Sequence, residues 1–148
     1  MPTNNKPADI LIIDDNESDA MLMEEAVKDT VMANSIKIVH SAAEGIKYLN
    51  QAEEYENAPR PDLILLDLKM PEMDGHDFLK IIKNDPRFLH IPIIVLTTSS
   101  DNNDIAESYR LHANCYIVKP VNFTKFKAMV AVINEFWLGI AHLPPKDR

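Results

Sequence analysis

Short apolar runs alternate with longer amphipathic stretches along this chain, five times over, and few folds accommodate that order. Three of the runs are apolar without alternation, which is typical of strands that are covered on both faces in a parallel sheet. The apolar runs are Asp9–Ile13, Ile36–His40, Asp62–Leu66, Ile93–Thr97 and Cys115–Val118. The stretches of helical length are Glu17–Ala33, Ala42–Ala52, Gly75–Asn84, Asp101–Leu111 and Phe123–Ile140.

Repeated strand–helix units predict an α/β fold in which helices cover both faces of a doubly wound (βα)5 parallel sheet. The 148 residues and the apolar fraction of 46% fit one compact domain with its own core. Ser41 and Glu44 are spaced as a capping box at the start of the second helical stretch. We therefore predict a single domain over residues 8–140, followed by a short tail, 141–148.

Charge and composition exclude several classes of function. The net charge of −8 and the lack of a basic stripe argue against binding to nucleic acid. No apolar run approaches the roughly 20 residues of a membrane span, and the first ten residues lack the apolar core of a signal peptide. A single cysteine rules out an intramolecular disulfide framework. We expect a cytoplasmic protein that binds neither nucleic acid nor membranes.

Polar residues of a few kinds come at the ends of the predicted strands. Asp14 and Asp15 follow the first run, Asp67 follows the third, Thr97 ends the fourth and Lys119 follows the fifth. In a doubly wound sheet these strand ends meet near the topological switch point. Carboxylates about 5 Å apart repel by roughly 3 kcal/mol per pair at an effective dielectric near 20. We therefore expect a bound cation, and oxygen ligands favour Mg²⁺.

A carboxylate can also act as a nucleophile that takes up a phosphoryl group. Phosphoryl transfer needs mainly positioning and neutralisation of the oxygen charges, and Mg²⁺, Lys119 and the Thr97 hydroxyl could each hold one oxygen. Any one of these residues could simply cap a helix. Their joint occurrence at successive strand ends favours a phosphoacceptor site.

Four segments resemble the signature of response-regulator receiver domains: IIDDN (12–16), LLDLKMPEMDG (65–75), IVLTTS (94–99) and YIVKP (116–120). The resemblance covers about residues 8 to 135. It implies a flavodoxin-like sheet with the strand order 2-1-3-4-5. It also implies a protein that accepts a phosphoryl group from a sensor histidine kinase.

Carried over residue by residue, the resemblance makes Asp67 the phosphoacceptor. It makes Asp14 and Asp15 the acid pair that serves Mg²⁺, with the backbone carbonyl of Lys69 as a further protein ligand. Gly75 matches the glycine that closes the loop after the acceptor strand. The protein is not expected to be an enzyme, because it takes the group onto itself and at most removes it by autodephosphorylation.

The resemblance also implies a switch. Thr97 matches the switch hydroxyl, Tyr116 the switch aromatic and Lys119 the phosphate-binding lysine, and the Lys119–Pro120 bond is usually cis in the family. Phosphorylation adds roughly −1.5 to −2 charges. Thr97 is then expected to move toward the phosphoryl oxygens and Tyr116 to rotate, which changes the surface of the fourth helix, fifth strand and fifth helix. His112 departs from the family, where many relatives have glycine.

Other functions fit less well. A phosphatase of the haloacid-dehalogenase type requires a second acid two residues after the nucleophile, where this chain has Lys69. A nucleotide-binding enzyme requires a glycine-rich loop, and this chain has three glycines. The alternative that stays open is a pseudo-receiver, which binds partners without being phosphorylated.

The end of the chain bears on partners. FWLGIAHLP (136–144) resembles the stand-alone regulators of cyanobacterial phytochrome histidine kinases, so we expect a phytochrome-type kinase as partner. We expect no output domain and signalling by contact. An a/d-like apolar stripe predicts a homodimer through the last helix and the switch face, with docking of the tail onto its own chain as the alternative. The stripe comprises Phe123, Phe126, Val130, Ile133, Trp137 and Ile140, flanked by Met129, Val132, Phe136, Leu138 and Leu143.

Overall fold

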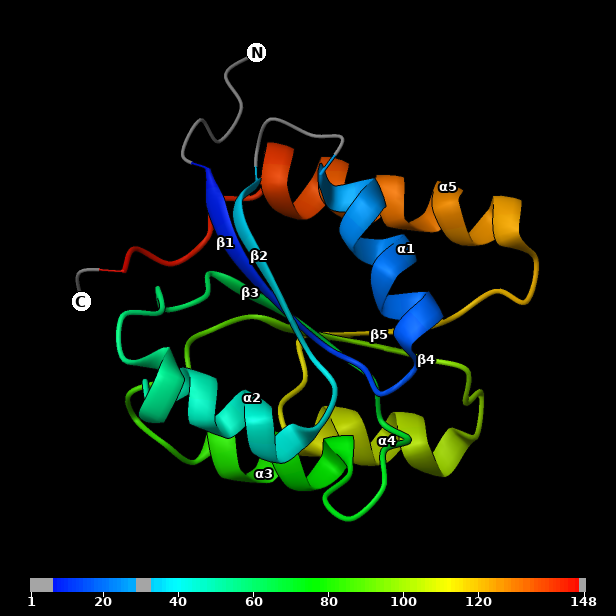
Figure 1. Cartoon of the computed structure of the whole chain (residues 1–148). Helices are drawn as coiled ribbons and strands as arrows, with labels where there is room; N and C mark the ends of the chain where they lie inside the picture. The colour runs from blue at the N-terminus through cyan, green and yellow to red at the C-terminus, as the bar shows by residue number, and fades with distance from the viewer. Residues whose placement is uncertain (1–6, 29–32, 147–148) are drawn as a thin grey trace.

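The computed structural model describes residues 7–28 and 33–146, which form a five-stranded sheet with helices on both faces (Figure 1). All neighbouring strands are parallel, in the order β2-β1-β3-β4-β5, as predicted. The strands are β1 (Ala8–Ile13), β2 (Ala33–Val39), β3 (Leu63–Leu66), β4 (Ile93–Thr97) and β5 (Cys115–Val118). The helices are α1 (Glu17–Lys28), α2 (Ala42–Leu49), α3 (Gly75–Lys83), α4 (Asn102–Arg110) and α5 (Phe123–Ile133).

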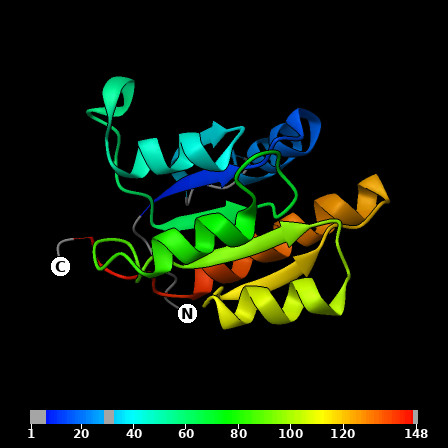
Figure 2. The ribbon, with the colours of Figure 1, turned by 90° about the horizontal axis from the view of Figure 1, so that it is seen from below.

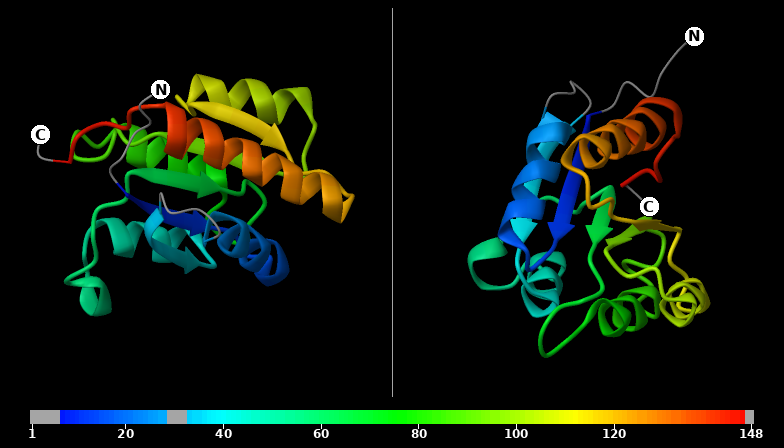
Figure 3. Two further views of the ribbon diagram at one scale, coloured as in Figure 1. Left: turned by 90° about the horizontal axis from the view of Figure 1, so that it is seen from above. Right: turned by 90° about the vertical axis from the view of Figure 1, so that its right-hand side faces the viewer.

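Helices α2, α3 and α4 cover one face of the sheet and α1 and α5 the other, as Figures 2 and 3 show from opposite sides. Successive residues of β1 enter different cores because side chains alternate across a strand. Leu11 lies in the core that contains Phe78 of α3, whereas Ile12 lies in the core that contains Phe126 of α5. This two-sided burial explains why the central strands are apolar without alternation.

The structure corrects several element boundaries, and the second predicted helix, for example, ends at Leu49 rather than at Ala52. The first helix ends at Lys28, and Ala33, predicted as its last residue, belongs to β2 instead. The predicted last helix, Phe123–Ile140, is α-helical only to Ile133 and continues as a π-helical segment over Asn134–Ile140. The Ala141 amide accordingly donates to the Phe136 carbonyl, five residues earlier, at 2.7 Å.

The tail is folded back onto its own domain. Leu138 is buried, and Trp137 and Leu143 pack against the core under α5, so these side chains do not widen an exposed patch as predicted. Further along, Lys146 forms ion pairs with Asp9 and Asp62. The prediction that Leu138 and Leu143 widen an exposed apolar surface was therefore wrong. For these residues the alternative holds, in which the tail docks onto its own chain. In the described ranges, no helix has both the length and the apolar character needed to cross a membrane.

Candidate functional site

The parallel ladder extends one residue beyond the strands and holds the backbone of the predicted site. The Asp14 amide donates to the Val39 carbonyl at 3.1 Å, and the Asp67 amide donates to the Ile13 carbonyl at 2.9 Å. At the other end of the row, the Lys119 amide donates to the Thr97 carbonyl at 2.7 Å. Four predicted site residues thus lie at one edge of the sheet because their strands are hydrogen-bonded neighbours.

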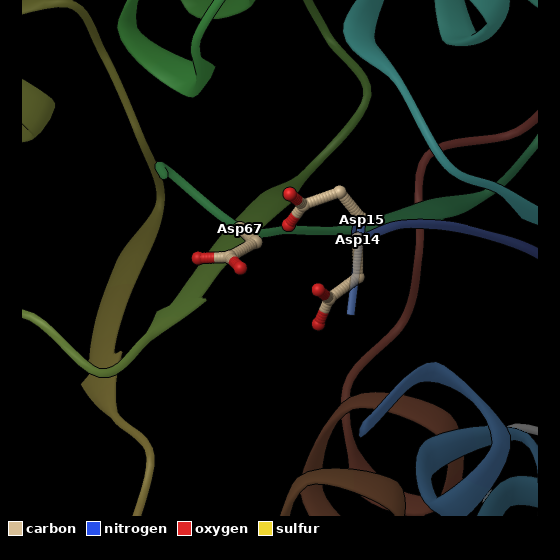
Figure 4. Close-up of side chains that lie close together, drawn as sticks. All are labelled: Asp14, Asp15 and Asp67. Carbon is tan, nitrogen blue, oxygen red and sulfur yellow. The ribbon is translucent and has the colours of Figure 1, made fainter. Parts of the chain in front are cut away.

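Three carboxylates converge at this edge. Oxygens of Asp14, Asp15 and Asp67 all lie within 4.8 Å of one another, and Figure 4 shows their side chains at the ends of two adjacent strands. Asp14 and Asp67 are buried, whereas Asp15 is exposed. Burial raises the pKa of Asp14 to about 6 from its ordinary 3.8, although hydrogen bonding to Lys119 opposes this shift.

Lys119 supplies the positive charge of the site. Its side chain is 3% exposed, and its Nζ lies 2.7 Å from Asp14 and 3.5 Å from Asp67. A third carboxylate, Asp19 of α1, lies 3.0 Å from the same nitrogen. Burial by itself lowers the pKa of Lys119, but the carboxylates of Asp14, Asp67 and Asp19 outweigh burial and raise it.

Sequence reasoning missed Asp19. It occupies the first turn of α1, where an acid is favourable for the helix dipole whatever lies nearby. The local pattern therefore has an ordinary explanation. A search for acids one turn after the Asp14-Asp15 pair is the signal that would have singled it out.

Gly75 is required by the close approach of the backbone of Asp67, the predicted phosphoacceptor. A Cβ on this residue would lie 2.6 Å from the Asp67 carbonyl oxygen and 2.7 Å from the Leu68 Cα. The Gly75 amide donates to the Leu68 carbonyl at 2.9 Å, and a reciprocal capping box between Asp74 and Asp77 starts α3 directly there. The loop that carries Asp67 is thereby held tightly against the helix.

The two residues predicted to form the switch, Thr97 and Tyr116, are connected through the loop between β4 and α4. Thr97 is fully buried, and the Tyr116 hydroxyl donates to the Ser99 carbonyl at 2.9 Å. The Ser99 hydroxyl donates to Asp104 at 2.6 Å, and Asp104 pairs with the Lys69 ammonium at 3.0 Å. Sequence reasoning identified neither Ser99 nor Asp104 as part of this connection. Use of the Lys69 carbonyl as a metal ligand stays a prediction.

Two expectations about the backbone have different outcomes. Among the described residues no peptide bond is cis, so the Lys119–Pro120 bond is trans, contrary to what the resemblance implies. His112 has a φ of 73°, in the left-handed region that favours glycine. The histidine therefore adopts a conformation that glycine would adopt more easily, at some cost in strain.

The donor set fits Mg²⁺. All three clustered side chains are carboxylates, and Lys119 alone does not neutralise them, since Asp19 adds a fourth negative charge. Hard divalent cations prefer such oxygen ligands, whereas zinc prefers nitrogen or sulfur. Asp14, Asp15 and Asp67 are the residues that would hold the ion.

Comparisons with known proteins agree with this geometry. The model of the response regulator receiver domain matches residues 10–131. The chain is 40% identical over 141 residues to response regulator Rcp1 of Synechocystis sp., covering 95% of this chain and 96% of that protein. The crystal structure of the phosphorylated cyanobacterial phytochrome response regulator RcpA has a TM-score of 0.90 at 43% identity, covering 94% of this chain and 99% of that one. The Mn²⁺-bound form of Rcp1 has a TM-score of 0.90 at 40% identity, covering 94% and 100%. The chain therefore belongs to the family of response regulator receiver domains.

Proposed function

We propose that Asp67 is the residue on which this receiver domain accepts its phosphoryl group. The observation that carries the assignment is the convergence of Asp14, Asp15 and Asp67 beside the buried ammonium of Lys119. Asp67 follows the middle strand of the sheet, so its neighbours reach the reacting group from both sides. Asp14 and Asp15 then serve mainly as ligands of Mg²⁺, with the Lys69 carbonyl.

In the transfer, an Asp67 oxygen forms a bond to phosphorus while the bond from phosphorus to the donor, a histidine nitrogen of the kinase, breaks. The departing nitrogen keeps the electron pair of that bond. Lys119 and the Thr97 hydroxyl donate hydrogen bonds to the phosphoryl oxygens. Asp14, Asp15 and Asp67 would hold Mg²⁺, which would supply further neutralisation of charge.

The same site is proposed to act as a switch. A Thr97 hydroxyl drawn toward the phosphoryl group moves the loop that carries Ser99, whose carbonyl accepts the hydrogen bond from Tyr116. Tyr116 then leaves this position, and the surface formed by α4, β5 and α5 changes. The Lys69–Asp104 ion pair joins the loop after Asp67 to α4. Both α4 and β5 are therefore coupled to the proposed phosphoacceptor.

Incubation with acetyl phosphate and Mg²⁺, followed by intact mass, tests the acceptor. The wild type is expected to gain the mass of one phosphoryl group and Asp67→Asn to gain none. Glu72→Gln removes an exposed acid from the same loop and serves as the matched control. A mass gain in Asp67→Asn contradicts the assignment, and no gain in any variant supports the pseudo-receiver.

We propose a phytochrome-type sensor histidine kinase as the donor. The support is the similarity along nearly the whole chain to Rcp1 and to RcpA, the latter described as a phytochrome response regulator. Phosphotransfer from a phytochrome kinase and from an unrelated kinase, compared by initial rate, tests the pairing. Equal rates would contradict it. We also propose a cytoplasmic location. The net charge of −8 supports the further proposal that the protein does not bind nucleic acid.

The homodimer is retained as a proposal on a smaller surface than the sequence predicted. Val132, Phe136 and Ile140, which follow one another at spacings of four residues, remain 49–65% exposed on α5 and the π-helical segment that follows it. Such a patch is costly to leave in water. Val132→Glu and Phe136→Glu in the full chain are expected to give monomers in light scattering. The wild type is expected to give a dimer. A wild type that stays monomeric, with or without acetyl phosphate, contradicts the dimer.

A further inference from the structure

The ammonium of Lys119 faces more carboxylates than the proposed reaction uses. An ammonium carries three protons, and the described residues offer it three acceptors: Asp14 at 2.7 Å, Asp19 at 3.0 Å and Asp67 at 3.5 Å. The longest of the three contacts is the one to the proposed phosphoacceptor. Lys119 is thus held closer to Asp14 and Asp19 than to the group on which the phosphoryl is proposed to sit.

Asp19 is fixed in this position by the start of α1. The Asn16 side chain accepts a hydrogen bond from the Asp19 amide at 2.9 Å, and the Ala20 amide donates to the Asn16 carbonyl at 3.0 Å. The Asp19 side chain is 25% exposed, whereas those of Lys119 and Asp14 are 3% and 0% exposed. Of the two shorter contacts, only the one to Asp19 can be given up with water taking the place of the lysine.

We propose that Asp19 is a positioning residue that holds Lys119 on the α1 side of the site and competes with the phosphoryl oxygens for its ammonium. The inference rests on the proposed role of Lys119 as a phosphoryl ligand. A phosphoryl oxygen needs a hydrogen bond from the Lys119 ammonium. The partly exposed carboxylate of Asp19 is the acceptor that the phosphoryl oxygen displaces most easily. Asp19 acts through Lys119 alone and sets how readily the lysine reaches the reacting group.

The competing explanation is that Asp19 only stabilises the helix N-terminus. Glu17 separates the two explanations, because it lies in the same first turn, is exposed, and is not among the described acids that pair with Lys119. Glu17→Gln removes the same charge from the same helix end. A helix effect is therefore shared by both variants, and a positioning effect is confined to Asp19→Asn.

The experiment measures the rate constant of phosphorylation by acetyl phosphate at saturating Mg²⁺, using the full chain and intact mass. Asp19→Asn is expected to raise it about five-fold, the effect of one partly exposed ion pair. Glu17→Gln is expected to leave it unchanged, and Asp19→Glu, which keeps the charge, to stay near the wild type. In a Lys119→Met background, Asp19→Asn is expected to have no effect. The affinity for beryllium fluoride, a phosphoryl mimic, is expected to rise by the same factor.

Different results would contradict the positioning role of Asp19 and the proposed phosphorylation of Asp67. A wild-type rate and affinity in Asp19→Asn overturn the positioning role while Asp67 phosphorylation stands. An equal increase in Glu17→Gln, or an increase that persists without Lys119, also overturns it. A wild type that is never phosphorylated overturns the proposed function, and the inference with it.

Discussion

Replacement of Lys119 by methionine is expected to destabilise the fold by an amount that depends on pH. The change keeps the length and most of the packing of the side chain but leaves Asp14, which is fully buried, without its cation. Removing one partner of a buried ion pair typically costs about 3–5 kcal/mol. We expect a loss of this size at pH 8 in the absence of divalent cations.

The pH dependence follows from where Asp14 holds a proton. In the wild type its pKa is about 6, so it is half ionised at pH 6 and almost fully ionised at pH 8, whereas in the unfolded chain, with the ordinary pKa of 3.8, it is ionised throughout this range. Without Lys119 its pKa rises further, and the folded variant keeps a proton that the unfolded chain lacks. The free energy of unfolding of the variant therefore falls as pH rises, by up to about 1.4 kcal/mol per unit. Between pH 6 and 8 the wild type itself loses about 0.4 kcal/mol as Asp14 gives up its proton, so the loss relative to the wild type should grow by up to about 2.3 kcal/mol.

Urea unfolding followed by circular dichroism at pH 6, 7 and 8 measures these differences. Lys125→Met, which removes an exposed lysine from α5, is the matched control and should change the free energy of unfolding by less than about 0.5 kcal/mol. Lys119→Met combined with Asp14→Asn should lose the pH dependence. Equal losses at pH 6 and pH 8, or a loss below about 1 kcal/mol at pH 8, would refute the reasoning.

Three further predictions concern the surroundings of the site. Gly75→Ala is expected to lower the free energy of unfolding by about 1–3 kcal/mol, because its Cβ collides with the backbone of Asp67 and Leu68; a chemical unfolding curve that matches the wild type would contradict this. Burial lowers the pKa of Lys83 to about 8 from its ordinary 10.5. Between about pH 8 and pH 10.5 the unfolded chain therefore binds more protons than the folded one, and the free energy of unfolding should rise as pH rises. After allowance for solvent screening, the free energy of unfolding should rise by about 1–2 kcal/mol. The rise should be absent in Lys83→Met and kept in Lys80→Met. A wild-type stability that does not change with pH would show that the carbonyl oxygens around Lys83 keep it charged. Tyr116→Phe removes the hydrogen bond to the Ser99 carbonyl and should raise amide hydrogen exchange in the loop between β4 and α4 in the unphosphorylated protein, and unchanged exchange would exclude that anchor.

Local pattern was sufficient for the order of the elements and for most of the site. Strands buried on both faces are continuously apolar, and Leu11 and Ile12, neighbours in the chain, enter different cores. Once the strands were placed, Asp14, Asp67 and Lys119 followed as a group, because parallel neighbours end at one edge of a sheet. These features depend on residues close together in the chain or on the topology of repeated units.

Long-range packing decided what the pattern left open. Asp19 and Lys119 are 100 positions apart, and they form an ion pair only because α1 packs beside α5 on the same face of the sheet. Leu138 looks like an exposed apolar residue in sequence, and it is buried because the chain turns π-helical after Ile133 and packs against the core. A side chain's charge or apolar character can be read from its own identity. Its partner is set by segments distant in the chain, and here those partners determine which charges the lysine meets and how much of the last helix stays free.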